Sequence, residues 1–124
     1  MKKIIHTDNA PKAVGPYSQA VEAGGTLYIS GQLPVDPATG KFPDSIEEQT
    51  TQCLKNVGAI LHAAGYDYAD VVKSTVLLDD IANFAAMNEI YAKFYVKDMP
   101  ARVSYQVARL PLGVKVEIET IAAK

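Results

Sequence analysis

Two charged side chains near the C-terminal end of the chain have types and positions suited to chemistry on a small molecule. Arg102 follows Pro100-Ala101 and opens a predicted strand, where its guanidinium can hold a carboxylate through two parallel hydrogen bonds. Glu117 stands among valine and isoleucine, and half-burial would raise the pKa of its carboxyl, so that it could exchange a proton or position water. A structural ion pair for Arg102 and an outward-facing, solvated Glu117 are the alternatives. We expect the stretch from Pro100 to Glu119 to carry a small-molecule site.

Three other segments offer polar groups to such a site. Ser30-Gly31-Gln32 stands where an apolar strand breaks, and glycine allows a backbone N–H to approach a ligand closely. Tyr17 lies in a loop, where its ring can close over a ligand, and Asn88 lies among the apolar positions of a predicted helix. Each has a structural alternative: a plain turn, a packed tyrosine and an exposed amide.

Signals for other chemistries are weak. His6 and His62 lack the spacing of metal ligands, and Cys53, the only cysteine, is expected to pack in the core. A single cysteine excludes an intrachain disulfide and fits a reducing compartment. The sequence has no glycine-rich phosphate loop, Gly-x-Ser-x-Gly elbow or His-Glu-x-x-His motif. We therefore expect no metal, no tightly held nucleotide cofactor and no serine triad.

The bulk properties indicate one small soluble domain. The 124 residues suit a single domain over residues 1–124, and 48% hydrophobic residues can supply a packed core. The net charge is −2 and the longest basic run is Lys2-Lys3, which argues against nucleic-acid binding. No apolar run approaches the ~20 residues of a membrane span, and the N-terminus turns polar too early for a secretory signal. We expect a cytoplasmic protein that does not associate with membranes.

Two segments are predicted to be helices, and six to be strands. The first helix covers residues 45–64, where Ser45 and Glu48 form a capping box and Gly65 ends the helix. The second covers about residues 80–95 and carries an apolar stripe at helical spacing. The predicted strands are Lys3–His6, Tyr17–Val21, Thr26–Ser30, Val71–Leu78, Arg102–Ala108 and Lys115–Ile121. Two helices cover one face of such a sheet, so the other face meets water or another copy of the chain.

Alternation along the last two strands predicts which residues share a face. The apolar set of each strand, including Val103, Tyr105 and Ile118, is expected to face the helices. Arg102 and Glu117 then lie on adjacent strands and on the second face of the sheet. Because that face also holds apolar residues, it suits an oligomer interface lined with polar groups.

The motifs in this order resemble the reactive intermediate deaminase A family, also called the YjgF or L-PSP family. The resemblance covers almost the whole chain. Its most specific part lies near the C-terminus. The motifs are Asn9-Ala-Pro, Gly15-Pro-Tyr-Ser-Gln, Ser30-Gly-Gln-Leu-Pro-Val, Pro100-Ala-Arg, Val107-Ala-Arg-Leu-Pro and Val116-Glu-Ile-Glu.

This resemblance implies an α+β, chorismate-mutase-like fold with two helices on one face of a mixed sheet. It implies a homotrimer with sites between subunits, and cofactor-independent hydrolysis of enamines and imines, such as 2-iminobutanoate, to 2-keto acids and ammonia. Arg102 would then bind the substrate carboxylate and Glu117 would hold or activate water. The backbone of Gly31, near Ser30, would help to orient the substrate, and Tyr17 and Asn88 would line the cleft. Ser104 would stand near the bound substrate.

One position departs from the family pattern. Many members have a cysteine two residues after the arginine, where this chain has Ser104. A hydroxyl donates and accepts hydrogen bonds but does not readily form a nucleophilic anion as a thiol does. Two alternatives to the deaminase are a small-ligand-binding regulatory protein and an endoribonuclease or translation inhibitor. The acidic net charge argues against the latter.

Overall fold

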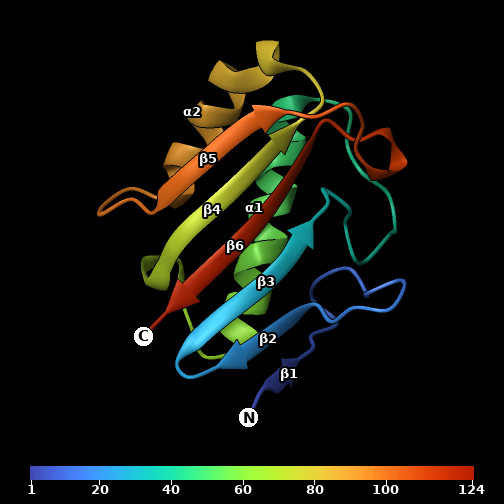
Figure 1. The fold of residues 1–124 in the computed structure, drawn as a ribbon. Coiled ribbons are helices and arrows are strands. Elements are labelled where there is room, and N and C mark those ends of the chain that lie inside the picture. The colour runs from blue at the N-terminus through green and yellow to red at the C-terminus, as the bar shows by residue number, and fades with distance from the viewer.

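The computed structural model describes residues 1–124 as one mixed sheet with two helices on one face. Figure 1 shows both helices behind the sheet, with no helix in front of it. The strands lie in the order β1-β2-β3-β6-β4-β5, and all pairs are antiparallel except β4 with β5. No helix is long and apolar enough to cross a membrane. The strands are β1 Lys3–Ile5, β2 Ala20–Ala23, β3 Thr26–Gln32, β4 Val71–Leu78, β5 Ala101–Gln106 and β6 Val116–Ala123.

Helix α1, Ile46–Ala63, begins and ends where its caps predict. The Ser45 hydroxyl accepts a hydrogen bond from the backbone N–H of Glu48 at 3.1 Å. At the other end Gly65 adopts φ +81°, in the left-handed region that glycine enters without strain. Both caps depend on neighbouring residues alone, which is why the sequence predicts them.

Helix α2, Phe84–Phe94, is shorter than predicted because a 3-10 turn, η2, takes up Ile81–Asn83. Asp80 caps that turn by accepting a hydrogen bond from Ala82 N at 2.9 Å. Met87 and Tyr91 are buried against α1 and the sheet, and the remainder of the predicted stripe is half-buried.

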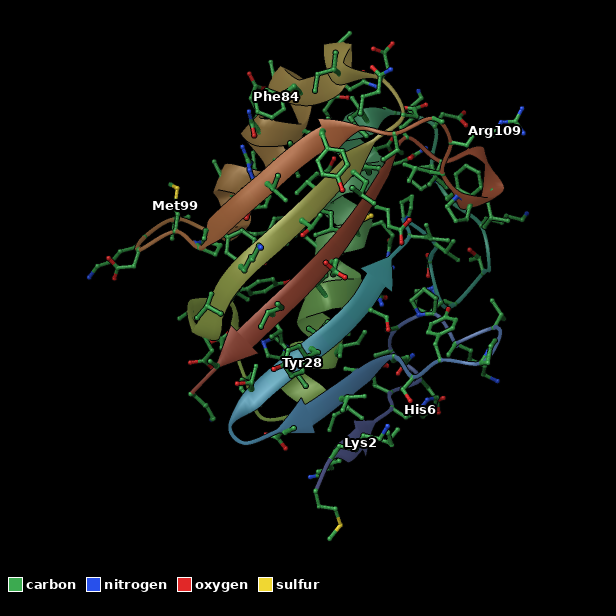
Figure 2. All side chains as sticks on the ribbon, in the orientation of Figure 1. Lys2, His6, Tyr28, Phe84, Met99 and Arg109 are labelled. Atoms are coloured by element: carbon green, nitrogen blue, oxygen red, sulfur yellow. The ribbon has the colours of Figure 1, made fainter.

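The core fills the space between the two helices and the inner face of the sheet. The predicted inward set of β6 is confirmed, since Val116, Ile118 and Ala122 are fully buried. The opposite face, called the open face below, exposes half of Tyr28. Figure 2 shows Tyr28 on the side of the sheet turned to the viewer and Phe84 on α2 behind it.

The predicted placement of β5 is wrong in two respects. Strand β4 lies between β5 and β6, so Arg102 and Glu117 are not on adjacent strands. Arg102 pairs with the buried Ser74 and therefore faces the helices, whereas Val103 and Tyr105 lie on the open face with 42% and 49% of their surface exposed. Alternation predicts which residues share a face, but it does not predict which face the helices cover.

Five of the six strands also differ from the prediction in their bounds, and β2 and β3 differ close to the expected site residues. Strand β2 begins at Ala20 rather than Tyr17 because the preceding segment folds as a loop around the buried side chain of Gln19. Strand β3 continues past Ser30 to Gln32 through a bulge.

Candidate functional site

Arg102 lies at the exposed edge where β5 meets α2. Its Nη1 donates a hydrogen bond to Asn88 Oδ1 at 2.7 Å. The guanidinium carbon lies 4.8 Å from the ring centroid of Tyr91 and 5.5 Å from that of Phe84. Arg102 forms no ion pair with a carboxylate of its own chain, so the structural ion-pair alternative has no support within one copy. A guanidinium has five N–H donors, so several remain for a ligand.

Ser104 lies two residues further along β5, on the same face as Arg102. Its Oγ is shielded from solvent and makes no hydrogen bond to another protein group. This hydroxyl is therefore available to donate or accept a hydrogen bond beside the arginine. We call Arg102, Asn88 and Ser104 the arginine half-site.

A cleft of about 720 Å³ opens on the other side of the sheet, between the N-terminal loops and the ends of β3 and β6. Four of the expected site residues line it: Tyr17, Ser30, Gly31 and Glu117. Arg102, Asn88 and Ser104 do not. We call this cleft the glutamate half-site.

A β-bulge places Glu117 against glycine in this cleft. Between Ile29 and Gln32, β3 has one residue more than the facing part of β6, and the extra length falls at Ser30-Gly31. A Cβ atom on Gly31 would overlap Glu117 Oε2 and lie 3.0 Å from its Cδ. The absence of a side chain at Gly31 therefore leaves room for the Glu117 carboxylate.

The environment of Glu117 favours the protonated carboxyl. Burial raises the pKa of Glu117 above its ordinary value, and the negative charge of Glu119 adds to the rise. A raised pKa brings the carboxyl nearer to the range in which it can both accept and return a proton.

The loop that carries Tyr17 is tied to the sheet by polar side chains. Ser30 Oγ donates to the Ser18 carbonyl at 2.6 Å, so this hydroxyl also has a structural role. Gln19, which the sequence analysis did not single out, accepts from Thr7 N and donates to Pro11 O, both at 2.8 Å. These bonds keep Tyr17 at the rim of the cleft, with about half of its surface exposed.

Gln49 is a second residue that the sequence analysis missed. Its Oε1 accepts from the backbone N–H of Lys115 at 2.7 Å, just before β6, and its Nε2 donates to Pro43 O. This buried side chain fixes the approach of the chain to Glu117. The sequence carries one signal for this role: Gln49 lies four residues before Cys53 and therefore shares the apolar stripe of α1.

The remaining titratable groups form no metal centre. No three His, Cys, Asp or Glu side chains lie close enough together to hold a metal ion. Cys53 is buried as predicted, donates to Gln32 O at 3.2 Å, and has its thiol pKa raised by burial. Its position supports a packing role.

The two half-sites lie on opposite faces of one chain. Arg102 projects toward the helix layer, whereas Glu117 follows the buried Val116 and points to the open face. The expectation that they share one face of the sheet is therefore wrong. One copy of the chain does not bring the arginine and the glutamate together.

A sequence model of the endoribonuclease L-PSP family matches residues 7–124. The chain belongs to this L-PSP family. A RutC family protein of Pyrococcus horikoshii is 54% identical over all of this chain and 99% of its own length. The 2-iminobutanoate/2-iminopropanoate deaminase of Capra hircus is 52% identical over all of this chain and 91% of its own.

Solved structures of L-PSP relatives share the fold. The crystal structure of E. coli TdcF with bound serine superposes with a TM-score of 0.96, at 46% identity and 98% coverage of both chains. The α+β arrangement predicted from the sequence, two helices on one face of a mixed sheet, is confirmed.

Proposed function

We propose that this chain hydrolyses small 2-imino acids, as a 2-iminobutanoate/2-iminopropanoate deaminase. The observation that carries the proposal is the state of Arg102, a guanidinium fixed by Asn88 but not neutralised by any carboxylate. Such a group suits a small substrate whose one strong handle is a carboxylate. Relatives about half identical over the full chain carry this deaminase name, and the ligand named for TdcF, serine, bears a carboxylate next to an amine-bearing carbon.

The proposed site joins the arginine half-site of one copy to the glutamate half-site of another. The opposite orientations of Arg102 and Glu117 within one chain support this arrangement. The open face supports it, because Tyr28, Val103 and Tyr105 are each exposed by two-fifths to one-half. Contacts between unlike surfaces form a ring when the rotation between copies closes, and the family resemblance indicates a ring of three.

The chemistry proceeds at the imine carbon in three steps. Arg102 holds the carboxylate, and the absence of a side chain at Gly31 leaves room for the Glu117 carboxylate beside the substrate. The ionised Glu117 takes a proton from water as the water oxygen bonds to the carbon, and it returns the proton to nitrogen. A second transfer, from the new hydroxyl to nitrogen, lets the C–N bond break and leaves a 2-keto acid and ammonia. Since an imine is already electrophilic, fixing water and substrate together supplies much of the acceleration.

The first test generates 2-iminobutanoate in place, with an amino-acid oxidase, and traps it with semicarbazide. The wild type should lower semicarbazone formation, and Arg102→Ala should not. Lys93→Ala is the matched control, since it removes an exposed cation from the last turn of α2 without touching either half-site. Equal rates of semicarbazone formation with wild type and with Arg102→Ala would contradict the deaminase mechanism.

The same variants separate the other functions. If neither protein lowers the semicarbazone, but 2-oxobutanoate binds the wild type and not Arg102→Ala, the chain is a ligand-binding protein. RNA cleavage lost in Arg102→Ala would instead place nuclease activity at this site. The net charge of −2, and the two carboxylates Glu117 and Glu119 at the cleft, do not suit a phosphate backbone.

A further inference from the structure

The guanidinium of Arg102 has a buried aromatic surface beneath it. Tyr91 lies closer to it than Phe84 does, at 4.8 Å against 5.5 Å, and is only 5% exposed. Phe84, which is half-buried, lies one helical turn before Asn88 on the same helix. Of the two rings, only Tyr91 therefore both lies close to the guanidinium and is held in place by burial.

Two buried polar side chains, Tyr95 and Ser74, lie next to the ring of Tyr91. Tyr95 packs against it, with ring centroids 4.7 Å apart and planes at 41°. Ser74 and Thr120, which pair on neighbouring strands, are fully buried. The hydroxyls of Tyr91, Tyr95, Ser74 and Thr120 form no hydrogen bond of regular geometry with another protein group. Ser74 nevertheless lies close enough to both phenols to oppose the rise in their pKa.

The cluster of buried hydroxyls lies beside the arginine. Ser74 pairs with Arg102 in the register of β4 and β5, so the cluster reaches the strand position from which the arginine extends. Burial raises the pKa of Tyr91, and the phenol stays neutral at physiological pH. The guanidinium therefore meets an uncharged ring face, which attracts it through the ring quadrupole without neutralising its charge.

A core made for stability alone would not be built this way. Buried hydroxyls that form no hydrogen bond of regular geometry destabilise a folded chain, and phenylalanine or valine would fill the same space. Local rules of this kind are broken most often at functional sites. The feature that the cluster supports is the plane of the Tyr91 ring under Arg102.

We propose that Tyr91 is a positioning residue that pre-orders Arg102 for the substrate carboxylate. The ring face fixes the guanidinium plane, Asn88 fixes its rotation through Nη1, and the remaining N–H groups are left for the substrate carboxylate. An exposed arginine otherwise has many rotamers, and ordering it upon binding weakens affinity. This inference rests on the proposed function and adds the residue that prepares the carboxylate clamp.

The test compares three substitutions of one ring. Tyr91→Phe keeps the aromatic face and should hold KM for 2-iminobutanoate within about threefold of wild type. Tyr91→Leu removes the face and should raise KM about tenfold, with a smaller change in kcat. Tyr91→Met fills much of the same volume without a ring, and it replaces the leucine variant if that fails to fold. Phe94→Leu is the control, since it removes a half-buried ring of α2 that packs on Tyr68 instead.

A double-mutant cycle distinguishes positioning from general damage. In the Arg102→Ala background, Tyr91→Leu should have no further effect on the residual activity or on 2-oxobutanoate affinity. The same proportional loss in both backgrounds, or an unchanged KM in Tyr91→Leu, would overturn the proposal.

A readout independent of activity keeps this inference separate from the proposed function. In ¹⁵N NMR spectra of the arginine side chains, the Arg102 guanidinium should be ordered in the wild type and in Tyr91→Phe, and mobile in Tyr91→Leu. If the wild type neither deaminates nor binds 2-oxobutanoate, the proposed function fails, and these spectra still decide the role of Tyr91. Equal mobility in all three proteins would refute it.

Discussion

The arginine half-site and the glutamate half-site hold opposite charges by opposite means. Arg102 lies exposed on an edge strand and is positioned by added contacts: one amide oxygen and two ring faces. Glu117 lies half-buried in an inner strand and is positioned by an absent contact, the missing side chain of Gly31 beside a bulge. The first arrangement keeps a permanent charge available, and the second makes a proton easier to retain.

This difference matches the two tasks of the proposed reaction. Holding a carboxylate needs a charge that does not titrate, which a guanidinium supplies at every physiological pH. Moving a proton needs a group whose pKa lies closer to the working pH, which burial supplies for Glu117. Substitutions that remove the fixed charge or the titrating carboxyl should therefore damage the two half-sites differently.

The largest effect is expected for Glu117→Gln. The amide fills the same space but cannot take a proton from water, so kcat should fall at least about 100-fold while KM changes little. Steady-state kinetics in the semicarbazide assay measure both constants. A kcat within a few-fold of wild type would show that the carboxylate does not handle the proton.

Gly31→Ala should lower kcat about tenfold, because its Cβ overlaps Glu117 Oε2 and displaces the carboxylate. Gly58→Ala offers a matched contrast, since its Cβ would overlap the Tyr68 hydroxyl, which bonds to Leu54 O inside the core. We expect the first variant to lose activity with little change in Tm, and the second to lose Tm. The reverse pattern would contradict the role given to the bulge.

Local signals in the sequence predicted more of this molecule than long-range ones. Ser45 and Gly65 limit α1 through contacts with their own neighbours, so both ends of that helix were predictable. Strand order and the covered face depend on how distant segments pack, and there the prediction failed for β5. The residue types at Arg102 and Glu117 indicated their chemistry. The supporting side chains, Gln19, Gln49 and Tyr91, acquire their roles only through partners far along the chain.

Stability should depend on pH through Glu117, with a sign set by its raised pKa. Because the folded carboxyl has a pKa above 4.5, ionisation opposes folding as pH rises through the interval from that ordinary value to the raised one. Glu117→Gln removes this penalty, so its Tm advantage over wild type should be larger at pH 7 than at pH 4. Wild-type kcat should fall as pH drops through the raised pKa. Thermal unfolding and kinetics across this range check both, and a Tm difference that does not vary with pH would count against the shift.

The smallest effect is expected for Ser104→Cys. The substitution restores the cysteine that many family members have at this position, and the thiol fills similar space beside Arg102. If this position only lines the site, kcat/KM should stay within about threefold of wild type. A larger change, or an activity that becomes sensitive to peroxide, would show that the serine alters turnover or redox response.

The most direct test of a site shared between two copies is subunit mixing. Arg102→Ala and Glu117→Gln should each be nearly inactive, but a trimer that contains both has one interface with an intact arginine and an intact glutamate. Refolding the two variants together at equal amounts should therefore restore about a quarter of wild-type activity, by random assembly of rings of three. Activity that stays at the sum of the two separate variants, or a solution mass of one chain, would contradict the account.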